Sequence, residues 1–301
     1  MKKLQLFNLL AMLLLLWSCN SIKENYDNCE TVTLTFSYLG DGTEDIFQDK
    51  ISSVSLYVYG ADGSLQQTKT IEQNNLKAFQ GTRLNLNPGS YRIVGVGNAL
   101  NKTSIENIAS SNGKDAYFGH PNVGTGMVDG NDSLYFGIQM INVPEKLWYT
   151  AEVPFKSSHF KVSYTVKGYV QETNMKSGES LLELKVHNLL PQTNFNNQVC
   201  GSKITYSPEL LYNNQNGNYS GAFNIMRQES VSDIQFELID KTLGTTIHTL
   251  NLADFLNQFT QIDITKQEVL IPIEIQYKHT GVIISIPDWM INDITPGYGT
   301  N

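Results

Sequence analysis

Residues 51–65 read ISSVSLYVYGADGSL, and residues 83–98 read RLNLNPGSYRIVGVGN. In the first stretch Val54, Leu56 and Val58 occupy every second position, which is the period of a strand with one buried face. The ADGS within it predicts a tight turn, because Asp and Gly tolerate positive φ. The second stretch reads as a strand, a Pro-Gly turn and another strand. Both stretches therefore predict short strands joined by tight turns.

The same alternation recurs through most of the chain. In residues 31–38, TVTLTFSY, apolar and aromatic side chains alternate with threonine and serine. Turn residues separate many such runs at short intervals, so the sequence predicts an all-β chain of sandwich or barrel type. Further runs are SLYFGIQMI (133–141), HFKVSYTVKGYV (159–170), SLLELKVHNL (180–189), DIQFELID (233–240), QEVLIPIEIQY (267–277) and GVIISI (281–286).

Helical patterns are confined to two short segments. In residues 101–110, NKTSIENIAS, Thr103 stands three residues before Glu106, the spacing of a capping box. Residues 252–261, LADFLNQFTQ, form the second candidate. We therefore expect one or two short helices beside the strands.

The 301 residues are enough for two domains of ordinary size. Pro144 and Pro154 interrupt the strand pattern, and a new series of strands opens at His159. We place the boundary at about residue 150, which divides the chain into β-sandwich domains at 31–150 and 151–301.

The chain begins with a basic pair, Lys2 and Lys3, followed by an apolar run over residues 4–16. That run has the length of a signal-peptide core and is too short for a spanning helix, which needs about 20 apolar residues. It ends in LLLLWSCN at residues 13–20, where Leu, Ser and Cys19 resemble the bacterial lipobox. An ordinary signal peptide with a chance cysteine is the alternative.

The lipobox predicts removal of residues 1–18 as a signal peptide and acylation of Cys19. Each buried CH₂ contributes about 0.8 kcal/mol, and two or more acyl chains hold firmly. The polar residues 19–30 would then be a short tether. The sequence thus predicts a protein held in the outer membrane by lipid, and KEN at residues 23–25 bears a weak likeness to a surface-export signal.

The charge of the chain excludes one class of partner. Loss of Lys2 and Lys3 takes the formal charge from −8 to −10, and the arginines Arg83, Arg92 and Arg227 are scattered. Without a basic patch, nucleic-acid binding is not expected.

Two cysteines remain beyond Cys19. An exported protein can form disulfides, so a bridge between Cys29 and Cys200 and a pair of separate thiols both remain open. We favour separate thiols.

The sequence holds no G-x-S-x-G, H-E-x-x-H or P-loop motif, so neither an enzyme nor a cofactor is expected. The acidic loops GDGTED (40–45) and DGNDS (129–133) lack the spacing of a calcium loop and are interpreted as turns. We therefore predict no metal site. Residues 120–132 are interpreted as a long exposed loop.

The positions of histidine and tyrosine in the strand pattern indicate which of these side chains lie at the surface. Five separated histidines are expected at the surface or rim of the strands: His120, His159, His187, His248 and His279. Tyr57 and Tyr59 alternate with inward Val and Leu, so we expect them, and Tyr164, to face outward. Exposed tyrosines would stack on sugar or on another subunit.

The pattern resembles the FimB/Mfa2 family, the fimbrillin-associated anchor lipoproteins of Bacteroidales. The matching hairpin residues are Val54, Leu56, Tyr57, Val58, Gly63, Pro88, Gly89, Tyr91, Val94 and Asn98. Residues 248–289, ending at Trp289, are similar to the closing hairpins of the family, whereas Gly95 stands where many members carry a larger residue. The resemblance implies two transthyretin-like β-sandwich domains and a minor subunit that anchors or terminates a fimbria, with fimbrial shaft or minor subunits as partners.

Shaft subunits of such fimbriae lose their first strand after cleavage at an arginine. In this chain no arginine precedes Arg83, which lies within a predicted strand. The first strand would therefore stay in place, which suits a base better than a shaft. Strand addition would then use a sheet edge, and residues 269–277 and 281–286 are strongly β-prone candidates. The alternative function is a glycan-binding surface lipoprotein of a polysaccharide-uptake system.

Overall fold

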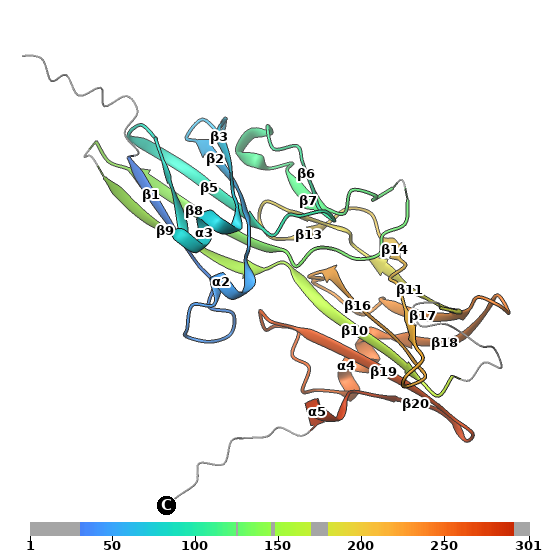
Figure 1. The fold of residues 1–301 in the computed structure, drawn as a ribbon. Helices are drawn as coiled ribbons and strands as arrows, with labels where there is room; N and C mark the ends of the chain where they lie inside the picture. The colour runs from blue at the N-terminus through green and yellow to red at the C-terminus, as the bar shows by residue number, and fades with distance from the viewer. Residues whose placement is uncertain (1–30, 125, 146–147, 170–179, 292–301) are drawn as a thin grey trace, which may run out of the picture.

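The computed structural model describes residues 31–124, 126–145, 148–169 and 180–291. The prediction of an all-β chain with few helices is confirmed. In Figure 1 the strands gather into two groups, at the upper left and the lower right, with β9 leading into β10 between them. We call residues 31–157 the first half and residues 159–291 the second half.

The first half is a sandwich made from one bent sheet of seven strands, in the order β3-β2-β5-β8-β9-β1-β4. Strands β8 and β9 pair only at Tyr135–Gly137 with Phe155–Ser157, so the sheet folds there and its two wings enclose one core. The strands are β1 (Val32–Ser37), β2 (Val54–Gly60), β3 (Leu65–Ile71), β4 (Gly81–Leu84), β5 (Gly89–Gly97), β8 (Tyr135–Val143) and β9 (Tyr149–Ser157), and the helices are α2 (Phe47–Lys50) and α3 (Gln73–Ala78).

The second half stacks two sheets on one core. The five-stranded sheet has the order β15-β16-β10-β19-β20, and the four-stranded sheet the order β14-β11-β17-β18. The elements are β10 (His159–Lys167), β11 (Leu182–Leu189), β14 (Ile204–Tyr206), β15 (Leu211–Asn213), β16 (Asn218–Met226), β17 (Gln235–Asp240), β18 (Thr245–Asn251), α4 (Leu252–Gln258), β19 (Leu270–Lys278), β20 (Gly281–Ser285) and α5 (Asp288–Ile291).

A fourth sheet joins the halves. It has the order β13-β12-β7-β6, and its central pair aligns Gln192 with Gly119 and Asn194 with Tyr117. Its strands are β6 (Ser104–Glu106), β7 (Tyr117–Gly119), β12 (Gln192–Asn194) and β13 (Val199–Cys200), with the 3₁₀ turn η2 (Ser111–Gly113) between β6 and β7. The predicted boundary at residue 150 stays a prediction; the strand pairing favours Ser158, because β9 still belongs to the first sheet.

One predicted helix forms and the other does not. Helix α4 begins after Asn251, whose side-chain oxygen accepts hydrogen bonds from the backbone N–H groups of Ala253 and Asp254. The capping-box helix at residues 101–110 is wrong, because this segment contains β6. The Thr103 hydroxyl donates to the Asp132 carboxylate at 2.7 Å and caps no helix.

The outward placement of the three tyrosines is also wrong. Tyr57 and Tyr59 are only 8% and 0% exposed, because segments from both halves cover the outer face of β2 and β5. The Tyr59 hydroxyl donates to the Ile108 carbonyl in the covering layer. Tyr164 points into the second core and stacks on Phe236, with 5.9 Å between ring centroids.

Gly95, the departure from the family pattern, has a packing reason. A Cβ at this position would lie 2.8 Å from Cζ of Phe155, and one at Gly137, its partner across β5 and β8, would lie 3.0 Å from the same ring. The phenyl ring of Phe155 thus occupies the space that two glycines leave.

Candidate functional site

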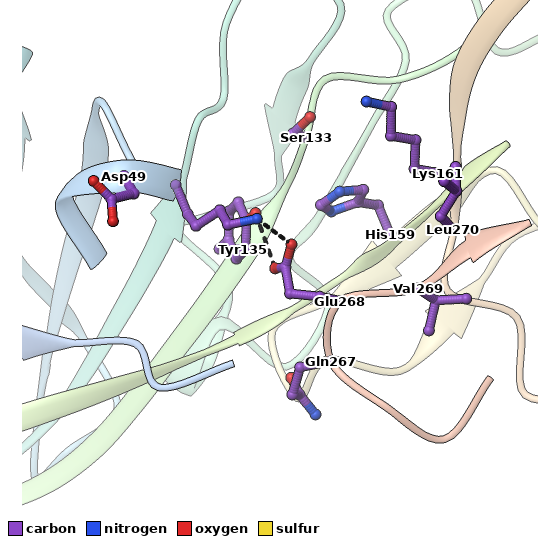
Figure 2. Close-up of a pocket in the computed structure, with 10 residues that line it drawn as sticks. Asp49, Ser133, Tyr135, His159, Lys161, Gln267, Glu268, Val269 and Leu270 are labelled. Carbon is purple, nitrogen blue, oxygen red and sulfur yellow. Dashed lines mark hydrogen bonds and ion pairs between the residues drawn. The ribbon is translucent and has the colours of Figure 1, made fainter. Parts of the chain in front are cut away.

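The junction of the two halves forms a polar, partly enclosed site. Glu268, just before β19, reaches the first half: Lys50 Nζ lies 2.6 Å from its carboxylate, and the Tyr38 hydroxyl donates to it. Figure 2 shows Glu268 directed toward Tyr135, with His159 on another side of the same cavity of about 290 Å³. A carboxylate of the second half thus receives its hydrogen bonds from donors in the first half.

The backbone beside Glu268 is held from both sides. The Asp41 carboxylate accepts hydrogen bonds from the N–H groups of Gln267 and Glu268, at 2.8 and 3.0 Å. Arg227 donates to the carbonyls of Lys266 and Gln267 while its guanidinium lies 4.7 Å from the Phe160 ring centroid. These contacts fix the segment that enters β19 against both halves.

Electrostatics keep the junction carboxylate ionised. Burial opposes the charge on Glu268, but the hydrogen bonds from Lys50 and Tyr38 outweigh it, so the pKa of the carboxyl lies below its usual range. Burial first, and Glu268 second, raise the pKa of the Tyr38 phenol. Both phenols at the site, Tyr38 and Tyr135, are therefore neutral donors at physiological pH.

The same site contains a serine next to a histidine, yet the geometry does not suit nucleophilic catalysis. His159 Nδ1 lies 2.9 Å from the Leu134 carbonyl, which only accepts, so this nitrogen carries the proton. Ser157 Oγ is 3.3 Å from that same nitrogen and donates instead to the His159 carbonyl. The His159 nitrogen that lies next to Ser157 therefore already carries a proton and cannot accept the Ser157 proton.

Each half also inserts a segment into the other. Phe195, from the second half, packs on Tyr57 and Phe136 of the first, and Arg92 donates to the Phe195 carbonyl. In return Val128, from the predicted loop 120–132, lies in the core of the second half, where its carbonyl accepts from Ser207 N–H at 2.8 Å. The two halves are therefore interlocked rather than linked by one strand connection.

The acidic loops use their carboxylates within the protein. Asp45 accepts from the N–H groups of Tyr38 and Phe47, and Asp132 accepts from those of Leu100 and Lys102. Among the residues that the structure describes, no group of three or more His, Cys, Asp or Glu side chains could hold a metal ion.

The surface prediction is wrong for two histidines. His159 is buried at the junction, and His120 is buried beside Asp129, 3.5 Å from Nε2 to Oδ1, with burial lowering the pKa of its imidazole. His187 lies half-buried between Thr205 Oγ1 and Glu237 Oε2, at 3.0 and 2.8 Å, on the outer face of the four-stranded sheet. His279 is exposed in the β19–β20 turn.

The free strand edges differ in their chemistry. In the first half, β3 carries Lys69 and β4 carries Arg83, and charged side chains discourage unwanted pairing. Strand β20 has the sequence GVIIS, without charge or proline, and its Val282 and Ile283 are 40% and 43% exposed. Of the two β-prone runs that the sequence singled out, β19 is internal, and β20 is an edge strand of its sheet among the described residues.

The predicted lipidation residue, Cys19, and Cys29 lie outside the described residues. Cys200 is a partly buried free thiol of β13, and burial raises its pKa. No helix in the described ranges has the length and apolar character needed to cross a membrane. Sequence reasoning did not find the contacts of Glu268 and Asp41, because nothing in their spacing links residues that lie more than 200 positions apart.

Comparison with known proteins identifies one family. The family model described as fimbrillin-A associated anchor proteins Mfa1 and Mfa2 matches residues 26–295. No curated protein matches the chain in sequence.

Three solved structures show the same fold at low identity. A candidate adhesin from Bacteroides ovatus is 17% identical with a TM-score of 0.68, covering 85% of this chain and 93% of its own. A candidate polysaccharide-binding protein from Bacteroides thetaiotaomicron is 14% identical with a TM-score of 0.67, covering 84% and 95%. The fimbrial anchor protein Mfa2 from Porphyromonas gingivalis is 14% identical with a TM-score of 0.63, covering 85% and 97%.

Proposed function

Because the chain belongs to the family of fimbrillin-A associated anchor proteins, we propose that it is a minor fimbrial subunit that anchors or terminates a fimbria at the outer membrane. Acylated Cys19 holds it in the membrane, and a strand edge joins it to the next subunit. The observation that carries the proposal is the match over residues 26–295. The lipobox before the matched region supports the membrane attachment.

The lipid anchor is tested by replacing Cys19 with alanine. We expect the C19A protein to leave the membrane fraction and to appear, with any fimbria it holds, in the medium, because the acyl chains supply the attachment. Cys29→Ala is the matched control and should stay in the membrane fraction. Membrane retention of C19A equal to that of C29A would contradict the anchor.

The first strand supports a terminal rather than a shaft position. Strand β1 lies between β4 and β9, and its side chains Val32, Leu34 and Phe36 are buried in the first core. Arg83 lies inside β4, after β1, β2 and β3. We expect N-terminal analysis of the protein from purified fimbriae to find β1 retained; a chain that begins after β1 would exclude this position.

Strand β20 is the edge that we propose for pairing with a neighbouring subunit. Within the part of the chain that the structure describes, no strand pairs with its outer edge, and its exposed Val282 and Ile283 suit an apolar partner strand. Lysines at both positions, V282K/I283K, should lower the recovery of the protein with fimbriae. Thr68→Lys on the exposed edge strand β3 is the control, and equal recovery of the two variants would remove β20 from the proposal.

A glycan-binding role is less well supported. It would need a platform of exposed aromatic rings, and the three tyrosines that the sequence offered, Tyr57, Tyr59 and Tyr164, are buried.

A further inference from the structure

Both halves are built around the same strand arrangement. In the first half the opening strand β1 pairs in parallel with β9, from Val32 opposite Tyr149 to Ser37 opposite Pro154. In the second half the opening strand β10 pairs in parallel with β19, from Lys161 opposite Leu270 to Lys167 opposite Gln276. All other pairs between named strands are antiparallel among the described residues.

The direction of these strands follows from the chain connections. Strand β9 runs into the junction and continues as β10, so the first residue of its parallel partner β1 lies at the end of the sheet away from the junction. Strands β10 and β19 both start at the junction and run away from it, so the β19–β20 turn lies at the opposite end of the molecule. Figure 1 shows this turn at the lower right and β1 at the upper left.

Resting on the proposed anchoring role, we propose that this chain carries tension, and that its two parallel ladders, β1 with β9 and β10 with β19, lie in series along the load. Lipid at the N-terminal end pulls β1 backward along its own axis. A fimbria attached at β20 pulls β19 forward, away from the junction. In the first pair, force then acts on the first residue of β1 and the last residue of β9. In the second pair, it acts on the first residue of β10 and the last residue of β19.

This geometry loads all hydrogen bonds of a ladder together. Pulling at opposite ends slides two strands along each other, so the bonds between them must yield at once. Pulling two strands apart from the same end breaks the bonds one after another. One backbone hydrogen bond is weak by itself, so the barrier to forced unfolding depends on whether the bonds break together or one after another.

The surroundings of each loaded strand add to its resistance. Strand β1 is bonded on both sides, to β9 and to β4, and β10 is bonded to β19 and to β16. The side chains Val162 and Val166 of β10 lie fully buried in the second core. At the link between the ladders, Gln267 accepts a hydrogen bond from Ser157 N–H, which ties the end of β9 to the segment entering β19.

Single-molecule pulling on the full mature chain tests the proposal, with Cys19, Cys29 and Cys200 replaced by serine. One handle is Thr280→Cys, in the exposed β19–β20 turn. The second handle is either the chain N-terminus, which loads both ladders along their strands, or Lys167→Cys. Because Lys167 lies at the far end of β10, that pair of handles peels β10 from β19.

We expect the unfolding force to be severalfold higher with the N-terminal handle than with the Lys167→Cys handle. The two proteins must first show the same free energy of unfolding in urea, so that they differ only in the direction of pulling. An unfolding force with the N-terminal handle that is equal to or below that of the peeling pair would overturn the proposal. The pulling test needs no membrane, so a negative result would not affect the C19A test of the lipid anchor. Conversely, membrane retention of C19A would refute the anchor without changing the measured unfolding forces.

Discussion

The two halves share a frame of strands and differ in what covers their outer faces. In the first half the outer face of β2, β5 and β8 is buried beneath the sheet of β6, β7, β12 and β13, with Tyr57 and Phe136 against Phe195. In the second half the outer face of β11 and β17 carries His187 and Glu237, which are partly exposed. The outer face of the first half is therefore packed as a second core, whereas the outer face of the second half is exposed to solvent.

The difference shows that alternation along a strand identifies its inner face but does not show whether its outer face is exposed or buried. Tyr57 and Tyr59 alternate with Leu56 and Val58 as a half-exposed strand would, yet both are buried. Phe195, more than 130 residues later, packs on Tyr57, and Ile108 lies over Tyr59 and accepts its hydroxyl hydrogen bond. The outer face is therefore decided by long-range packing. The predictions below test this contrast between the covered and the open face.

The largest effect is expected from Phe195→Ala in the covering segment. Phe195 is 1% exposed, and removal of a fully buried phenyl ring typically costs about 3–5 kcal/mol of unfolding free energy. Urea unfolding measures the change. Gln198→Ala, at an exposed position of the same segment, is the control and should change the free energy by less than about 0.5 kcal/mol. If the two variants were equally stable, the covered face would not be a core.

The inner face of the first half gives the next effect, through Gly95. Gly95→Ala should destabilise the fold by about 1–3 kcal/mol, because the new methyl group meets the Phe155 ring. Phe155→Leu should relieve the clash, so the double variant should lose less than the sum of the two single variants. A double-mutant cycle measures this coupling, expected at about 0.5–3 kcal/mol. Strict additivity would show that Phe155 is not the reason for the glycine.

These residues show how far the sequence alone reaches. Alternation and turns predicted the all-β fold, and the spacing of apolar residues placed Val54, Leu56 and Val58 in a core. Local sequence rules were wrong where residues distant in sequence make the contacts. Thr103 donates to Asp132 rather than capping a helix, and Val128, in the predicted loop, packs in the core of the second half. The junction was not predictable, because Asp41 and Glu268 carry no motif and meet only in the folded chain.

Acid should weaken the junction in two separate pH windows. Burial lowers the pKa of His159 below its ordinary value of 6.5, so the unfolded chain binds its proton first and stability falls as the pH drops below about 6.5. Glu268 has a folded pKa below its ordinary value of 4.5, so its contribution is complete above 4.5 and is lost as the pH falls through the folded pKa.

Urea unfolding of His159→Asn and Glu268→Gln across pH 3–8 separates the windows. The slope of unfolding free energy against pH changes by at most about 1.4 kcal/mol per unit for one proton. H159N should flatten the curve only in the upper window and E268Q only in the lower one. A curve that is unchanged in both variants would mean that the junction does not couple these groups to folding.

The smallest effect is expected on the open face of the second half. His187 and Glu237 keep 31% and 25% of their side-chain surface, so water already solvates the pair. A double-mutant cycle with His187→Ala and Glu237→Gln should give a coupling of about 0.2–1 kcal/mol, because a solvated polar pair gains little over its separately hydrated groups. Since Phe195→Ala removes a buried ring and these variants remove only solvated polar contacts, their effects should differ severalfold. A coupling as large as the loss in F195A would mean that the second outer face is covered as well, and the contrast between the two halves would not hold.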